Sequence, residues 1–277
     1  MRALSLIPTA QISRDAFVRA WPRYALYLTN IKIIYFYDLD PASVQHLWSL
    51  AVEEHFYLVW PAVVALVPAR ALLPFTCAVI AAVVIGRAVW LAHGADPIAV
   101  YMLSWTRADS LLIGGVLAML QRHDRAWVVV VRAAPLLAAG ALAACFVDVP
   151  SLRYLFIALF FAALLAWCVA ADERGSAAPL LRSRALQRLG VVSYGVYLFH
   201  FFFAMALGRE VKKLFGGSFA GFFLLLLAVS LATGVLAALS FRYVEKPALA
   251  LKRHVAGPPS LRPAGVRADP HSDRSLR

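Results

Sequence analysis

Residues 46–61 place a histidine, a serine and two adjacent carboxylates at the start of a long apolar segment, His-Leu-Trp-Ser-Leu-Ala-Val-Glu-Glu-His-Phe-Tyr-Leu-Val-Trp-Pro. Imidazole and carboxylate groups can act as general acids and bases in enzymes. A charged side chain costs about 3 kcal/mol or more at the centre of a membrane helix, so it marks a functional site by default. The alternative is an interfacial turn whose charges stay in water.

On a helix, the polar side chains of this segment fall largely on one face. His46 and Glu53 lie seven residues apart, which is two helical turns, and Ser49 and Tyr57 share their side of the helix. Glu54 points about 100° away from Glu53. We take His46, Glu53 and Glu54 as candidate catalytic groups, and Ser49 and Tyr57 as candidate substrate contacts.

A second polar cluster, Arg107 and Asp109, opens an apolar run that continues Ser-Leu-Leu-Ile-Gly-Gly. On a helix these two side chains point about 200° apart, so we expect them to meet different partners rather than each other. An arginine alone could snorkel to the interface, but an aspartate has too short a stem to reach far. Because arginine can bind an anionic or carbonyl group, both residues are candidates for substrate binding.

Two further polar clusters lie nearer the C-terminus. Ser193, Tyr197 and His200 share one face of an apolar run, with His200 as a candidate catalytic group and Tyr197 as a candidate substrate contact. The alternative for them is a plain hydrogen bond between helices. Arg242 and Glu245 lie three residues apart at the end of the last apolar run, where the spacing favours a structural ion pair.

The composition predicts an all-α, polytopic transmembrane helix bundle. Of the 277 residues, 62% are hydrophobic and only 15% are charged, whereas a soluble domain is about half apolar and a quarter charged. The net charge of +12 resides mostly in short loops and the tail, so we expect a lipid bilayer rather than nucleic acid as partner. The three cysteines, Cys77, Cys145 and Cys168, show no metal-ligand spacing, and no metal is predicted.

Seven apolar runs reach about the 20 residues that a helix needs to cross a bilayer. The bundle is expected over residues 46–250, with residues 1–45 at the outer side or the interface. Residues 251–277 are expected to form a disordered basic tail, because they hold little apolar surface to bury. The expected spans cover residues 50–68, 71–92, 103–121, 126–147, 152–171, 189–207 and 219–241.

Basic residues in alternate loops predict the orientation. They gather at Arg70, in residues 121–125 and 172–188, and in the tail, so this side and the C-terminus are expected to be cytoplasmic. Three of the four polar clusters then lie toward the outer half of the bundle. No cleavable signal peptide is visible in residues 1–20, and the basic N-terminal segment falls on the outer side, against the rule. This suggests that Met1 is not the natural beginning.

Together, these four motifs resemble the membrane-bound acyltransferase 3 family, the polysaccharide and sugar O-acyltransferases of bacterial inner membranes. The block at residues 46–61 is close to the family's most recognisable motif, and the likeness runs from about residue 25 to residue 250. It implies transfer of an acyl group, commonly acetyl from acetyl-CoA, onto a hydroxyl of a cell-surface carbohydrate or lipid-linked glycan. Acyl-CoA would be the donor substrate, with no bound cofactor.

The resemblance also implies roles for the candidate residues. Glu53 and Glu54 would sit in the acceptor or catalytic pocket, Arg107 and Asp109 would belong to the same site, and His200 would support it. Family members begin with about three further helices, of which the first carries an arginine and a catalytic or acyl-relaying histidine. Nothing before His46 resembles that helix, so we expect a truncated form that is inactive by itself. The alternatives are an inactive remnant and a transporter, although no repeat between the halves supports a transporter.

Overall fold

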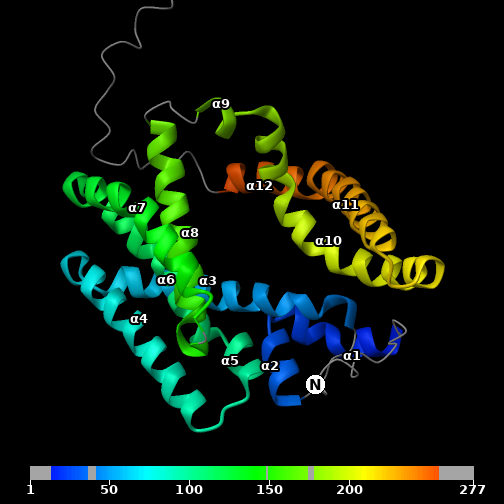
Figure 1. The fold of residues 1–277 in the computed structure, drawn as a ribbon, viewed down its shortest axis with the longest axis horizontal. Coiled ribbons are helices and arrows are strands. Elements are labelled where there is room, and N and C mark those ends of the chain that lie inside the picture. Colours follow the sequence, from blue (N-terminus) through cyan, green and yellow to red (C-terminus); the bar gives the residue numbers. More distant parts are fainter. Residues whose placement is uncertain (1–13, 37–41, 148, 174–177, 256–277) are drawn as a thin grey trace, which may run out of the picture. The chain divides into compact units, whose positions relative to one another are not determined.

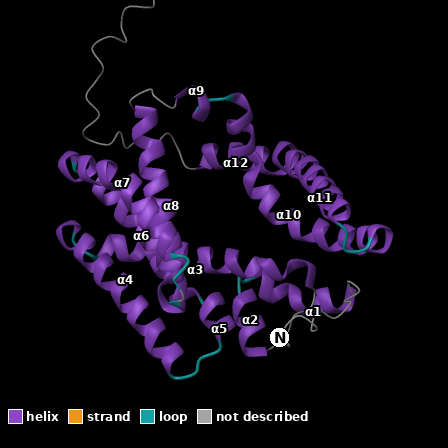
Figure 2. Ribbon diagram, in the orientation of Figure 1, coloured by secondary structure: helices purple, strands orange, loops and turns teal. Residues whose placement is uncertain are grey.

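A computed structural model describes residues 14–36, 42–147, 149–173 and 178–255 of the chain. Within these ranges every regular element is a helix, and short loops join the helices (Figure 1 and Figure 2). The predicted all-α class is therefore confirmed. The helices, in chain order, are α1 (Arg14–Ala25), α2 (Thr29–Phe36), the 3-10 helix η1 (Ala42–Leu47), α3 (Trp48–Leu66), α4 (Ala69–Ala92), α5 (Pro97–Met102), α6 (Ser104–Gln121), α7 (Asp124–Ala144), α8 (Pro150–Glu173), α9 (Ala178–Leu181), α10 (Arg184–Phe215), α11 (Phe219–Ser240), the π-helical turn η2 (Phe241–Glu245) and α12 (Lys246–Val255).

Each of the seven expected spans is a helix in the structure, namely α3, α4, α6, α7, α8, α10 and α11. Six helical stretches among the described residues are long and apolar enough to cross a membrane. The seventh, α6, has 18 residues and carries Arg107 and Asp109 near its start. The polytopic bundle of about seven spans is confirmed.

The chain divides into two compact units, and each is described by itself. The first comprises residues 1–189 and 204–206, and the second comprises residues 190–203 and 207–277. In the first unit α6 packs against α3, α4, α7 and α8, and α7 packs along α8. Small side chains let helix backbones approach closely, and most of the buried apolar residues of α7 and α8 are alanines. These buried alanines are Ala134, Ala141, Ala163, Ala166, Ala170 and Ala171.

In the second unit a glycine allows α10 to approach α11. A Cβ atom added to Gly195 would lie 3.0 Å from the Cβ of Ala237 and 3.1 Å from its Cα, so a larger side chain does not fit there without a shift. Both Gly195 and Ala237 are buried. The contact between α10 and α11 thus depends on two of the smallest residues.

The expected ion pair between Arg242 and Glu245 does not form. These residues belong to η2, whose π-helical hydrogen bonds run from residue i to i+5 and change the phase of the side chains. Glu245 Oε1 instead accepts a hydrogen bond from Ser240 Oγ at 3.4 Å, and the Arg242 guanidinium lies 5.6 Å from the centre of the Tyr243 ring. The helix continues as α12 to Val255, and residues 256–277 of the expected tail lie outside the described residues.

Candidate active site

Polar side chains from several helices of the first unit converge on the N-terminal end of α6. The local sequence sets this end in two steps: the Asp96 carboxylate caps α5 by accepting from the Ile98 amide at 2.9 Å, and extended Leu103 then separates α5 from α6. The Thr106 hydroxyl donates to the Leu103 carbonyl oxygen at 2.7 Å, so this carbonyl has a hydrogen-bond partner at the break between α5 and α6. Ser104 and Arg107 are thereby placed at a helix start, where free backbone amides favour negative charge.

A completely buried ion pair fixes this end of α6. The Arg87 guanidinium, from α4, donates to Asp109 Oδ2 at 2.7 Å, and neither side chain is exposed. The same guanidinium donates to the carbonyl oxygens of Thr106, at 2.6 Å, and Ser151, at 2.7 Å, so it joins α4, α6 and α8. Removing two charges from water is costly, and the pair is tolerated because hydrogen bonds occupy the guanidinium. This geometry favours a positioning role for Asp109.

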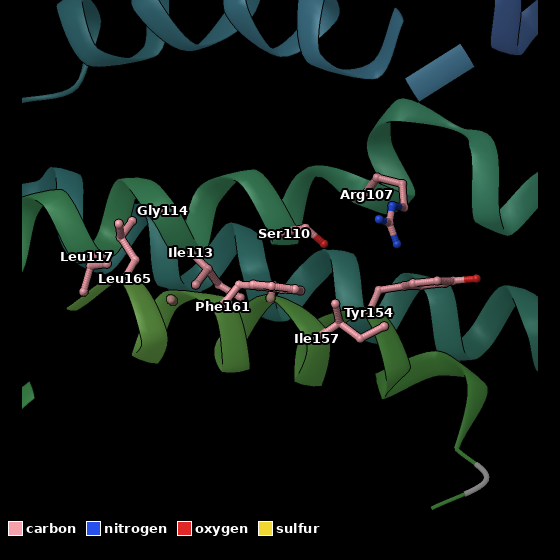
Figure 3. Close-up of a pocket in the computed structure, with 11 residues that line it drawn as sticks. Arg107, Ser110, Ile113, Gly114, Leu117, Tyr154, Ile157, Phe161 and Leu165 are labelled. Carbon is pink, nitrogen blue, oxygen red and sulfur yellow. The ribbon is translucent and has the colours of Figure 1, made fainter. Parts of the chain in front are cut away.

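Arg107 meets different partners from Asp109, as the helical phase predicts. Its guanidinium lies 4.3 Å from the centre of the Tyr154 ring and 5.6 Å from that of Tyr101, and it lines a pocket between α6 and α8 (Figure 3). Cation–π contacts of this kind hold a guanidinium in place without neutralising it. The arginine is therefore positioned to meet an anionic or carbonyl group.

A hydrogen bond between His55 and Ser104 joins α3 to α6. Nδ1 of His55 lies 2.7 Å from Ser104 Oγ, and Asn30 Nδ2, from α2, donates to the same oxygen at 2.9 Å. Since the amide nitrogen of Asn30 can only donate, the serine hydroxyl can direct its own hydrogen to His55. Asn30 also donates to the Met102 carbonyl oxygen at 3.3 Å, so three helices and the end of α5 are tied together.

The candidate residues around α3 occupy different environments. Glu53 and Tyr57 are exposed, whereas Glu54 is half-buried. His46 lies in η1 rather than on α3. The expected row of polar side chains therefore starts in η1 and continues onto α3. The Ser49 hydroxyl donates to the His46 carbonyl oxygen at 3.3 Å, which stabilises the junction of η1 and α3. Glu53 thus lies on the helix that His55 holds to α6, two residues before His55 and about 200° around the helix from it.

The remaining candidates, Tyr197 and His200, lie on α10 in the second unit. His200 Nδ1 donates to the Tyr197 carbonyl oxygen at 2.6 Å, and the two rings lie 5.6 Å apart, centre to centre. The Ser193 hydroxyl donates to the Gly190 carbonyl oxygen at 2.8 Å. These hydrogen bonds fix the local orientation of the His200 ring on its own helix, and its participation in the site stays a prediction.

Comparison with known proteins gives this arrangement its family. The sequence profile of an acyltransferase domain, that of the acyltransferase 3 family, matches residues 3–239. The chain belongs to the acyltransferase 3 family. This membership and the six apolar helices together make it a multi-pass membrane protein. No solved structure matches the chain.

Two curated relatives of this acyltransferase domain are named for cell-wall chemistry. The putative peptidoglycan O-acetyltransferase YrhL of Bacillus subtilis is 33% identical over 240 residues, which are 78% of this chain and 36% of that protein. The peptidoglycan O-acetyltransferase OatA of Listeria monocytogenes is 32% identical over 227 residues, which are 75% of this chain and 35% of that protein. The chain spans about a third of the length of these relatives.

Sequence reasoning missed several polar residues that build the site of this acyltransferase domain. Arg87 is the one cation between residues 71 and 92, and a lone arginine deep in an apolar run is itself a signal of function or pairing. His55 directly follows the two glutamates in the sequence, and the pair of carboxylates is the more prominent signal. Lys32 is buried on α2 with its ammonium 5.6 Å from the centre of the Tyr24 ring, and nothing in its local pattern predicted burial.

Proposed function

We propose that this chain forms the membrane part of an O-acyltransferase, which moves an acyl group, commonly acetyl, from acyl-CoA to a hydroxyl of a cell-surface carbohydrate. The names of the two relatives support peptidoglycan as the acceptor, and a lipid-linked glycan is the alternative acceptor. One observation carries the assignment of the site: in a chain of this family, the exposed Glu53 carboxylate lies on α3, the helix that the hydrogen bond between His55 and Ser104 fixes on α6.

Glu53 is the proposed general base. The acceptor hydroxyl oxygen attacks the thioester carbonyl carbon, and Glu53 takes the hydroxyl proton as the new C–O bond forms. The C–S bond then breaks, and the departing CoA thiolate recovers that proton. Acyl-CoA is a substrate in this scheme, and the chain's own contribution is to position the two reactants and to move one proton.

The neighbouring residues have supporting roles in this proposal. Glu54 and His46 are further catalytic candidates beside Glu53, and His200 is a candidate from the second unit. Ser49, Tyr57 and Tyr197 are proposed substrate contacts, whose hydroxyls can bind sugar hydroxyls. The buried Arg87–Asp109 pair positions α6, and Arg107 is left to meet an anionic group.

The proposed setting is the bacterial inner membrane, with the C-terminus in the cytoplasm. The basic residues of the loops that contain Arg70, Arg122 and Arg182 support this orientation. The N-terminal end of α6 then lies near the outer surface, where a carbohydrate acceptor is located. For the direct transfer described above, the thioester of a cytoplasmic acyl-CoA would have to reach through the bundle to this end.

The experiment is a transfer assay with membranes from cells that express the complete reading frame. Membranes receive acetyl-CoA labelled in the acetyl group, and peptidoglycan fragments are recovered and treated with mild base. The proposal predicts label in an ester that base releases, and no label when acetyl-CoA is replaced by labelled acetate. Label that accumulates inside sealed vesicles without any ester product would instead indicate a transporter.

A further inference from the structure

A pocket of about 320 Å³ lies between α6 and α8, and it is separate from the His55–Ser104 contact. Figure 3 shows its lining side chains in a row along the two helices, with Arg107 and Tyr154 at one end and Leu117 and Leu165 at the other. We call this feature the α6–α8 slot. Its volume falls at the lower limit of pockets that hold small ligands.

One end of the slot carries a positive charge with unused hydrogen-bonding capacity. An amino nitrogen of the Arg107 guanidinium is buried and has no hydrogen-bond partner among the described residues. Its nearest acidic neighbour in sequence, Asp109, is occupied by Arg87 at 2.7 Å. A buried donor without a partner is costly, so the geometry at this end calls for an anion.

The rest of the slot is apolar and open along one side. Ile157, Phe161 and Leu165 repeat every four residues on α8 and are 39%, 59% and 55% exposed. On α6, a Cβ atom added to Gly114 would have no neighbour within 4 Å, so the glycine leaves room in the slot. This shape accommodates a flexible alkyl chain that enters sideways from the surrounding bilayer.

We propose that the α6–α8 slot binds one molecule of an anionic phospholipid, with its phosphate on Arg107 and one acyl chain along α6 and α8. The open side leaves the second acyl chain in the bilayer, which favours a two-chain lipid over a free fatty acid. With the orientation predicted from the loops, Arg107 lies toward the outer surface and the slot runs inward. A lipid of the outer leaflet is arranged in the same way, with its headgroup at the outer surface and its acyl chains pointing inward.

A neighbouring pocket provides an internal contrast. It measures about 140 Å³ and shares Ile113, Leu117 and Ala162 with the slot. Its remaining lining residues, from Val116 to Ala163, carry no charge. Of these two pockets, the slot is therefore the one that combines an apolar channel with a cation, and the proposal assigns lipid binding to it.

The test measures retained lipid and requires neither acyl donor nor acceptor, so its outcome is independent of the proposed transfer activity. The purified full protein is placed in nanodiscs of phosphatidylcholine that contain a minor fraction of phosphatidylglycerol, and native mass spectrometry counts the lipids that stay bound. Wild type should retain one phosphatidylglycerol in preference to phosphatidylcholine. Arg107→Gln should lower that preference about tenfold, the loss expected from one charge-assisted hydrogen bond.

Two glycine variants test whether lipid is lost because the slot is filled, rather than because any helix receives a larger side chain. Gly114→Leu places a side chain in the slot and should displace the lipid, whereas Gly140→Leu on α7, where an added Cβ also meets nothing within 4 Å, should retain it. Thermal unfolding in detergent checks that all variants are folded. Equal retention by wild type and Arg107→Gln, retention of added palmitate but not phosphatidylglycerol, or no bound lipid because another helix fills the slot would each overturn the proposal.

Discussion

The Arg87 guanidinium and the Asp109 carboxylate lie 2.7 Å apart, and neither side chain reaches solvent. Because Arg87 also binds carbonyl oxygens of α6 and α8, this pair determines how three helices of the first unit meet. One buried contact thus fixes the helix start that carries Ser104, beside the slot that Arg107 lines.

The buried ion pair predicts that a single substitution destabilises the protein much more than a double substitution does. Arg87→Met leaves Asp109 charged and unpaired, and should destabilise the protein by about 3–5 kcal/mol. Adding Asp109→Leu should recover most of that loss, because an apolar pair removes the unpaired charge. Thermal unfolding in detergent measures both. The control is Lys213→Met, which breaks the exposed pair with Glu210 and should change stability by less than about 1 kcal/mol. A double variant no more stable than the single one would contradict this account.

His55 is predicted to position Glu53 through its hydrogen bond to Ser104. His55→Leu removes that bond and should lower the kcat of acyl transfer by about 100-fold, the cost of a small misplacement of a catalytic group. His55→Gln should restore most of the rate, because its amide can still bind the Ser104 hydroxyl. His93→Leu, an exposed histidine at the end of α4, serves as the control. Failure of glutamine to rescue would show that His55 itself transfers a proton.

The contact between α10 and α11 predicts opposite effects at two glycines of α10. Gly195→Ala should destabilise the second unit by about 1–3 kcal/mol, since the new methyl group would lie 3.0 Å from that of Ala237. Gly190→Ala meets nothing within 4 Å and should be neutral or stabilise the helix by up to about 1 kcal/mol. Thermal unfolding of the two variants gives the comparison, and equal shifts would argue against a close approach at Gly195.

The predicted orientation can be read from cysteine labelling. After replacement of Cys77, Cys145 and Cys168, a cysteine at Asp96 should react in intact cells with a reagent that cannot cross the membrane. A cysteine at Arg182 should react only after the cells are opened. Arg182 is exposed and donates to Asp172 at 2.9 Å, so this position lies at the surface of its loop. The reverse labelling pattern would invert the topology.

The sequence predicted the elements of this protein better than it predicted their contacts. Apolar runs of about 20 residues gave all seven expected spans, and helical phase correctly separated Arg107 from Asp109. The partner of Asp109 could not be derived, because it depends on which helices pack together, and Arg87 lies 22 residues earlier in another span. The Arg242–Glu245 pair was wrong because a π-helical turn changes the phase that the spacing argument assumed.

In the proposed mechanism the Glu53 carboxylate, on the helix fixed by His55, removes the proton from the acceptor hydroxyl. The direct test compares Glu53→Gln with wild type in the transfer assay, using membranes that contain the complete protein at equal amounts. Glu210→Gln, an exposed glutamate paired with Lys213 on α10, is the matched control. We expect a loss of about 100-fold or more in kcat for Glu53→Gln and no change for Glu210→Gln. Transfer by Glu53→Gln at the wild-type rate would contradict this mechanism.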